Sequence, residues 1–441
     1  MKDSEKASIE LRKKIEGRSA RVSVIGLGYV GLPLAVELGK AGFEVTGVET
    51  SSDKVSLIEA GRSDVQGIPD FEVAGLKAVG KLSATLDYDA TGESDVIIIC
   101  VPTPLNKTRD PDVSFIIDAF TQIAKRARRG QLVVLESTTY PGTTQEVVLP
   151  LLEERALKVG EDFFLAFSPE RVDPGNQVYT LKNTPKVLGG VTDSCTDMAK
   201  LFYQQVISEL VPVSSTGAAE MVKMLENTFR SVNIALVNEV ALMCDRLGID
   251  VWEVIDAAAS KPFGFIPFYP GPGLGGHCIP VDPHFLAWKL RSLNFHSRFI
   301  ELSGEITRGM PAYVVSKIGD ALNRFEKSIN GSAVLVLGVT YKPDVDDIRE
   351  SPALDIIANL QEKGANVSYN DPFVDELSVE PLNMKSVTLT EDQIASADCV
   401  VITTNHSSYD CSWIVEHALC IVDTRNATKE VSDADRKVVK L

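Results

Sequence analysis

One cysteine of this 441-residue chain, Cys278, follows a glycine-rich segment that leaves room around its thiol. Gly275 and Gly276 precede it, and Asp282 stands four residues after it. Small residues ahead of a thiol let a substrate carbon approach, and they let backbone N–H groups face a developing oxyanion. The pattern favours a nucleophilic cysteine beside a carboxylate; a structural Gly-Gly turn is the alternative.

A second segment has the pattern Gly-x-Gly-x-x-Gly between an apolar run and a helical pattern, with Glu49 eighteen residues after its last glycine. These glycines serve a tight turn, close backbone approach to a pyrophosphate, and helix packing. Glu49 can bind ribose hydroxyls but would repel a 2′-phosphate, so the segment predicts NAD rather than NADP. The expected cofactor residues in the turn are Gly26, Gly28, Tyr29, Val30 and Gly31. A hydride acceptor and a thiol together can take an alcohol through an aldehyde to an acid.

Polar side chains follow three further apolar runs. Thr103 and Thr138 are expected to face the nicotinamide side of the crevice, and loop capping is the alternative for both. Glu170 and Arg171 follow the next run. Glu170 could orient a water molecule for hydrolysis; a surface ion pair is the alternative.

Lys223 and Asn227 stand four residues apart in a helical pattern, so both project from one helix face. Their apolar neighbours suggest that the two side chains point into a pocket, where they could stabilise an alkoxide or oxyanion. A solvated polar stripe is the alternative.

The elements that must position these residues form two α/β patterns around a helical middle. We expect an α/β fold with two Rossmann-like doubly wound sheet domains, at 1–208 and 318–441, and a helical central domain at 209–317. Its long connecting helix spans 216–247, and the second α/β pattern begins after Pro311. Strands are expected at 21–25, 43–48, 95–101, 131–136, 163–167, 333–337, 366–369, 399–403 and 419–422.

Composition excludes several classes of protein. The net charge is −17 and no lysine- or arginine-rich block is present, so we expect no nucleic-acid partner. The sequence contains no apolar run of the ~18 residues that a membrane span needs and no signal-peptide pattern. Seven scattered cysteines without a Cys-x-x-Cys pair argue against a metal site or a disulfide framework and favour the cytoplasm.

Taken in order along nearly the whole chain, the motifs resemble those of the UDP-glucose/GDP-mannose dehydrogenases. These NAD-dependent enzymes oxidise a nucleotide sugar twice at C6. The motifs are the Gly26 turn, Val101-Pro102-Thr103-Pro104, Ser168-Pro169-Glu170, Lys223 with Asn227, Gly275-Gly276-His277-Cys278, and Tyr341-Lys342-Pro343-Asp344 leading to Arg349-Glu350-Ser351.

The resemblance implies roles for individual residues. Cys278 is the implied nucleophile, Lys223, Asn227 and Asp282 handle charge and protons, and Thr138 and Glu170 place the hydrolytic water. Arg349 is implied to face the cofactor. The implied UDP-sugar contacts are Glu170, Arg171, Lys223, Asn227, Tyr269, Gly275, Lys342 and Arg425, although a strand-end ion pair is a fair alternative for Arg425.

One position bears on the sugar. Enzymes of the family that oxidise UDP-glucose carry a lysine where this chain has Val281. The segment around Cys278 is more similar to the branch acting on UDP-N-acetylhexosamines, UDP-N-acetylglucosamine before UDP-N-acetylmannosamine. A cytoplasmic homodimer serving polysaccharide biosynthesis is expected. A two-electron hydroxyacid dehydrogenase and a nucleotide-sugar sensor without turnover are the competing hypotheses.

Overall fold

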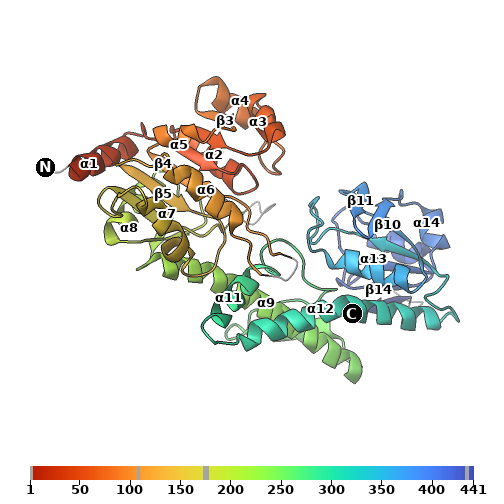
Figure 1. The fold of residues 1–441 in the computed structure, drawn as a ribbon. Coiled ribbons are helices and arrows are strands. Elements are labelled where there is room, and N and C mark those ends of the chain that lie inside the picture. The colour runs from red at the N-terminus through yellow and green to blue at the C-terminus, as the bar shows by residue number, and fades with distance from the viewer. Residues whose placement is uncertain (1–2, 107–109, 172–177, 433–436) are drawn as a thin grey trace. The chain divides into compact units, whose positions relative to one another are not determined.

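The computed structural model describes residues 3–106, 110–171, 178–432 and 437–441. They group into two compact units, Met1–Glu226 with His284–Asn294, and Asn227–Pro283 with Phe295–Leu441. Each unit contains its own sheet, mainly parallel in the first and parallel in the second (Figure 1). The predicted fold class, with two Rossmann-like sheets and a long central helix, is confirmed.

The sheet of the first unit has the strand order β3-β2-β1-β4-β5-β6-β7-β8. Its pairs are parallel except for β6 with β7, which is antiparallel. The central strands are buried along their whole length, as apolar strands covered on both faces must be. The strands are β1 (Arg21–Ile25), β2 (Glu44–Val48), β3 (Leu82–Thr85), β4 (Val96–Ile99), β5 (Gln131–Leu135), β6 (Phe163–Phe167), β7 (Lys186–Gly190) and β8 (Leu210–Pro212).

The helices of the first unit connect these strands. Side chains of Ser51 and Thr192 accept backbone N–H groups at the starts of two of them. The helices are α1 (Asp3–Glu16), α2 (Gly31–Lys40), α3 (Ser52–Glu59), α4 (Asp70–Ala78), α5 (Asp89–Glu93), α6 (Ser114–Ala124), η1 (Thr143–Val148), α7 (Leu149–Glu153) and α8 (Asp193–Tyr203).

A long helix, α9 (Thr216–Leu247), has the predicted bounds. It is followed by α10 (Val251–Ala259), α11 (Asp282–Arg291) and α12 (Arg298–Asn323). The second α/β pattern begins after Pro311, as expected, with its first strand at Ala333–Leu337, while α12 continues through this buried proline to Asn323. The expected domain boundary at 317–318 therefore falls inside α12, and the three-part division stays a prediction.

The second sheet has the order β10-β9-β13-β14-β15, parallel throughout. Its strands are β9 (Ala333–Leu337), β10 (Asn366–Asn370), β13 (Cys399–Ile402), β14 (Ile421–Asp423) and β15 (Val438–Lys440). A separate hairpin joins β11 (Glu376–Val379) to β12 (Leu382–Lys385), and the helices are α13 (Pro352–Glu362), α14 (Glu391–Ser396) and α15 (Cys411–His417). Within the part of the chain that the structure describes, no helix is both long and apolar enough to cross a membrane.

Candidate active site

The turn between β1 and α2 requires two of its three glycines. Gly26 has a φ of +87°, and a Cβ there would stand 2.6 Å from the Cys100 carbonyl oxygen. A Cβ on Gly31 would stand 1.9 Å from the carbonyl oxygen of Gly26. A Cβ on Gly28, by contrast, would have no atom within 4 Å. The first and third glycines close the turn, and the second leaves its backbone open to a ligand.

Glu49 lies at the end of β2 and is held by backbone groups. Its carboxylate accepts the N–H of Leu27 at 2.9 Å and that of Thr50 at 2.7 Å. Burial opposes ionisation, but these bonds outweigh it and lower the pKa of Glu49. The group is therefore an anion at neutral pH, as an acceptor of ribose hydroxyls should be.

The start of α2 fits the pyrophosphate of NAD. Its N-cap residue, Val30, makes no side-chain cap, and the first turn has no acidic residue. Uncapped N–H groups at a helix start attract anions. Thr103 is buried after β4, and Thr138 is half-buried after β5.

Lys223 and Glu170 form a buried pair in the first unit. The Lys223 ammonium donates to the main-chain carbonyl of Glu170 at 2.7 Å and to its carboxylate at 3.2 Å. Their side chains are only 7% and 5% exposed, so a solvated stripe and a surface ion pair are both wrong readings of these residues. Arg171 has different partners, the Pro185 carbonyl at 2.6 Å and the carboxylate of Glu226.

One pocket of the first unit brings predicted cofactor and substrate residues together. Val30 of the dinucleotide turn lines it with Glu170 and Arg171. The pocket has a volume of about 350 Å³, part of which is open to solvent. It also contains Glu136 and Lys186, which the sequence reasoning did not single out.

The second unit places Cys278 and Asp282 in one tight turn. The Cys278 carbonyl accepts the N–H groups of Val281 at 3.1 Å and of Asp282 at 2.8 Å. The side-chain amide of Asn227 donates to the buried Asp282 carboxylate. The half-buried thiol is therefore followed by a carboxylate that is itself held by the helix α9.

The glycines before Cys278 are closely covered. A Cβ on Gly275 would stand 2.6 Å from the Cβ of Tyr341, and one on Gly276 would stand 2.9 Å from the Tyr341 ring. The Gly276 N–H also donates to the Arg349 carbonyl at 3.0 Å. The thiol segment therefore packs on the loop after β9, so the glycines are needed here for close packing, which the sequence reasoning did not foresee.

Arg349 is half-exposed and forms three hydrogen bonds from its guanidinium to Asp347, the shortest at 2.6 Å. Burial, and then the positive charge of Arg349, lower the pKa of His277. His277 is therefore neutral at pH 7.

Tyr269 and Arg425 lie in the second unit. Tyr269 is 47% exposed, stacks on Trp252, and donates its hydroxyl to Asp256 at 2.8 Å. The Arg425 guanidinium donates to the Thr403 carbonyl at 3.0 Å, and desolvation lowers the pKa of Arg425 to about 10. Arg425 is thus a cation at neutral pH.

Asn238 is a residue that the sequence reasoning missed. It is fully buried on α9, and its side-chain oxygen accepts the N–H of Gly271 at 2.9 Å. It stands eleven residues after Asn227, three helical turns along the same face. The repetition of polar residues at helical spacing was the signal that could have revealed it.

Comparison with known proteins identifies the family. The NAD-binding, central and UDP-binding domains of the UDP-glucose/GDP-mannose dehydrogenase family match residues 20–207, 217–308 and 335–430. A UDP-N-acetyl-D-glucosamine 6-dehydrogenase of Pseudomonas aeruginosa is 37% identical over 81% of this chain and 84% of its own. A UDP-N-acetyl-D-mannosamine dehydrogenase of Methanococcus maripaludis is 35% identical over 88% of this chain and 87% of its own.

Among solved structures, a UDP-N-acetylmannosamine dehydrogenase of Pyrococcus horikoshii superimposes with a TM-score of 0.87 and 33% identity, over 95% of this chain and 98% of that one. The three domains occur in chain order, and their matched ranges include most strands of both sheets and the helices α10 and α11 between them. The chain therefore belongs to the UDP-glucose/GDP-mannose dehydrogenase family and is an NAD-dependent nucleotide-sugar 6-dehydrogenase.

Proposed function

We propose that this enzyme oxidises UDP-N-acetylglucosamine to its uronate, a four-electron reaction that uses Cys278 as nucleophile. The observation that carries the proposal is the turn holding Cys278 and Asp282 together, with Asn227 bonded to the carboxylate. The sugar is inferred from Val281, which stands where relatives acting on UDP-glucose carry lysine, and from the Pseudomonas aeruginosa relative. UDP-N-acetylmannosamine is the second candidate, because the Pyrococcus horikoshii relative is named for it.

The proposed chemistry begins at the C6 hydroxyl of the sugar. NAD accepts a hydride when bound, so two NAD molecules are reduced for each alcohol taken to the acid. Lys223 and Asn227 lie on one face of α9 and stabilise the alkoxide that forms as the hydroxyl proton passes to solvent water. The Cys278 sulfur then adds to the C6 aldehyde carbon as a thiohemiacetal, which keeps the aldehyde bound. The second oxidation gives a thioester.

Hydrolysis releases the product and restores the thiol. Water attacks the thioester carbon, the carbon–sulfur bond breaks, and the proton returns to sulfur. We propose that Glu170 and Thr138 place this water and that Asp282 exchanges protons with the thiol. Arg171, Tyr269, Gly275, Lys342 and Arg425 are proposed to bind the UDP-sugar, and Arg349 the cofactor.

Replacing the nucleophile tests the reaction. Cys278→Ala should abolish uronate formation, because no covalent capture of the aldehyde is possible. The reaction is measured as NADH formation with UDP-N-acetylglucosamine or another UDP-hexose as substrate, and the uronate is identified by mass spectrometry. Cys411→Ala is the matched control, since Cys411 is also half-buried, starts α15 and has no role in the proposed chemistry.

The number of NADH molecules formed per product and the turnover with each sugar distinguish this proposal from the alternatives. Two NADH per product are expected; one would indicate a two-electron hydroxyacid dehydrogenase. No NADH with any sugar would favour a sensor. Fastest turnover with UDP-N-acetylmannosamine would correct the sugar while leaving the cysteine chemistry intact.

We further propose a homodimer that pairs copies of α9. Several of its large apolar side chains are exposed and recur at spacings of four and seven, as in a helix-pairing seam. They are Leu225, Phe229, Leu236, Met243 and Leu247. Sedimentation of the native protein and of Leu236→Glu tests this proposal, with the variant expected to be a monomer.

A further inference from the structure

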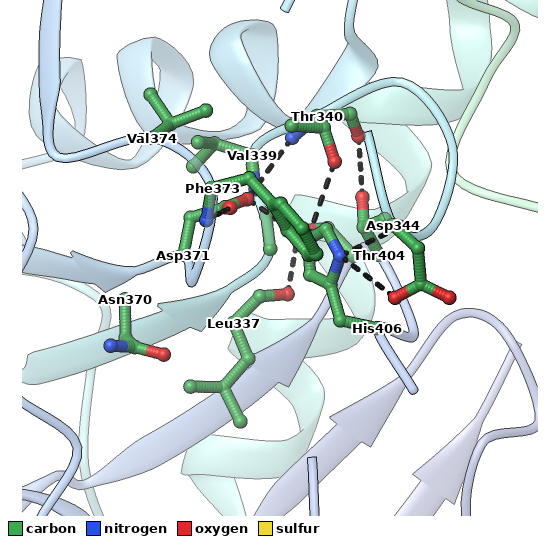
Figure 2. Close-up of polar contacts among 12 residues, drawn as sticks. Leu337, Val339, Thr340, Asp344, Asn370, Asp371, Phe373, Val374, Thr404 and His406 are labelled. Atoms are coloured by element: carbon green, nitrogen blue, oxygen red, sulfur yellow. Dashed lines mark hydrogen bonds and ion pairs between the residues drawn. The ribbon is translucent and has the colours of Figure 1, made fainter. Parts of the chain in front are cut away.

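A buried histidine lies where three strands of the second sheet end. His406 follows β13, Asp371 follows β10, and the loop 338–344 follows β9. These strands are parallel neighbours, so their carboxyl ends meet, and Figure 2 shows the side chains converging there. The side chains of His406 and Asp371 are 0% exposed.

The hydrogen bonds of His406 fix its protonation. The backbone N–H of Asp344 donates to its Nδ1 at 3.0 Å. Because a backbone N–H is only a donor, Nδ1 must be the acceptor, and Nε2 carries the proton. Nε2 lies 3.0 Å from the Asp371 carboxylate and donates to it, with the Thr340 hydroxyl also near at 3.3 Å. The ring is therefore neutral and joins two residues through its two nitrogens.

Asp371 completes the connection to the start of the loop. The same carboxylate oxygen accepts the N–H of Val339 at 2.7 Å and that of Thr340 at 3.3 Å. Burial opposes its charge, but the bonds from His406 and from the backbone prevail and lower the pKa of Asp371. The loop is thus fastened near its start through Asp371 and at Asp344 through His406 (Figure 2).

The fastened loop carries residues that the reaction needs. Lys342 lies between the two attachment points and is a proposed substrate contact. Tyr341 packs on Gly275 and Gly276, directly ahead of Cys278. A loop that moved would displace both the lysine and the support of the thiol segment.

We propose that His406 is a positioning residue, which as the neutral Nε2–H form links Asp371 to Asp344 and holds Lys342 and Tyr341 for the nucleotide sugar. This inference rests on the proposed function for the role of Lys342. It extends that function to a buried group with no contact to the reacting atoms.

Three substitutions separate the two bonds of the ring. His406→Ala removes both. His406→Asn keeps an oxygen near the Nδ1 position to accept the Asp344 N–H, and His406→Gln keeps a donor toward Asp371. Loss of UDP affinity should be about tenfold in the alanine variant, equivalent to about 1.4 kcal/mol. It should be smallest in the asparagine variant, because Asp371 still has two backbone donors there.

Titration calorimetry with UDP alone measures the affinity. Amide hydrogen exchange over 339–344 should be accelerated most in the alanine variant and least in the asparagine variant. In turnover, KM for the nucleotide sugar should rise with KM for NAD unchanged. His417→Asn is the matched control, since this histidine of α15 bonds to the Trp413 carbonyl at 2.8 Å, and its variant should behave as the native protein.

Native-like UDP affinity in a folded His406→Ala would overturn the proposal, as would equal changes in KM for the sugar and for NAD. If the alanine variant does not fold, the difference between the glutamine and asparagine variants decides. If the native enzyme reduced NAD with none of the sugars tested, the proposed function alone would be refuted. UDP titration and hydrogen exchange would still test the role of His406.

Discussion

The first unit contains two buried lysine–glutamate pairs that differ in how their charges are held. Lys186 donates to Glu136 at 3.0 Å, and the buried Tyr203 hydroxyl bonds to the other oxygen of the same carboxylate. The Lys186 ammonium also lies 4.9 Å from the Tyr203 ring centre. Both carboxylate oxygens of Glu136 are thus bound by side chains of the chain itself.

Lys223 is anchored differently, since its shorter bond goes to the main-chain carbonyl of Glu170. That anchor does not depend on the Glu170 carboxylate, so the lysine can exchange its carboxylate contact for a substrate oxygen without losing its place. Burial and pairing are common to both lysines, so they do not single out the lysine that we propose to be catalytic. The two differ in their partners, since Lys223 is also bonded to a main-chain carbonyl whereas Lys186 is bonded to a carboxylate.

The largest effect is expected from a substitution in the Lys223–Glu170 pair, which we propose to be catalytic. Lys223→Met should lower kcat by about 10²–10⁴-fold, the usual contribution of a group that assists proton transfer. Turnover of the proposed substrate is measured per folded molecule, with folding followed by circular dichroism. Turnover within about threefold of native would contradict the assignment of Lys223.

Breaking the other pair should change stability instead. Lys186→Met leaves the Glu136 charge buried without its cation and should lower the free energy of unfolding by about 3–5 kcal/mol. Thermal and denaturant unfolding measure the loss. Because Lys186 and Glu136 also line the pocket of Glu170 and Arg171, kcat per folded molecule should fall, but far less than in Lys223→Met. The control is Lys186→Met with Glu136→Gln, which removes the unpaired charge and should recover much of the stability. A folded but inactive Lys186→Met would mean that this pair also serves the reaction.

The contrast between the pairs shows what the sequence could and could not predict. Lys223 was identifiable because Asn227 follows it by one helical turn in a continuous pattern, and α9 has the expected bounds. Lys186 was not, because it starts β7, a strand that ends in two glycines and lacks a long apolar run. Its partner Glu136 is 50 residues away in sequence, and only the sheet brings them together.

The same limit applies to the rest of the fold and site. Central strands such as β1 and β6 were predicted with their full bounds, because a continuous run of mainly apolar residues indicates a buried strand. The strands β3, β8 and β15 were missed because runs of three or four residues are too short to show a strand pattern. The glycine turn and the Cys278 segment are local patterns, whereas the His406–Asp371 pair depends on strand order.

The smallest expected effect concerns Tyr203. Burial, and then the Glu136 charge, raise the pKa of Tyr203 well above its ordinary value. The folded state therefore keeps its proton where the unfolded chain has lost it. The stabilisation is complete below the unfolded pKa of about 10 and is lost as pH rises above it, by up to about 1.4 kcal/mol per pH unit.

Tyr203→Phe removes both the titration and the bond to Glu136. At neutral pH it should lower the free energy of unfolding by about 1.5–3 kcal/mol, as expected for a hydrogen bond to a charged group. Above pH 10 the gap between variant and native protein should narrow, because only the native protein loses the tyrosine contribution. Denaturant unfolding between pH 7 and pH 11 measures both. A stability difference between variant and native protein that stays constant with pH would mean that the pKa of Tyr203 is the same in the folded and unfolded chain. The Glu136 carboxylate would then not be bound at both oxygens, and the contrast with the Lys223–Glu170 pair would fail.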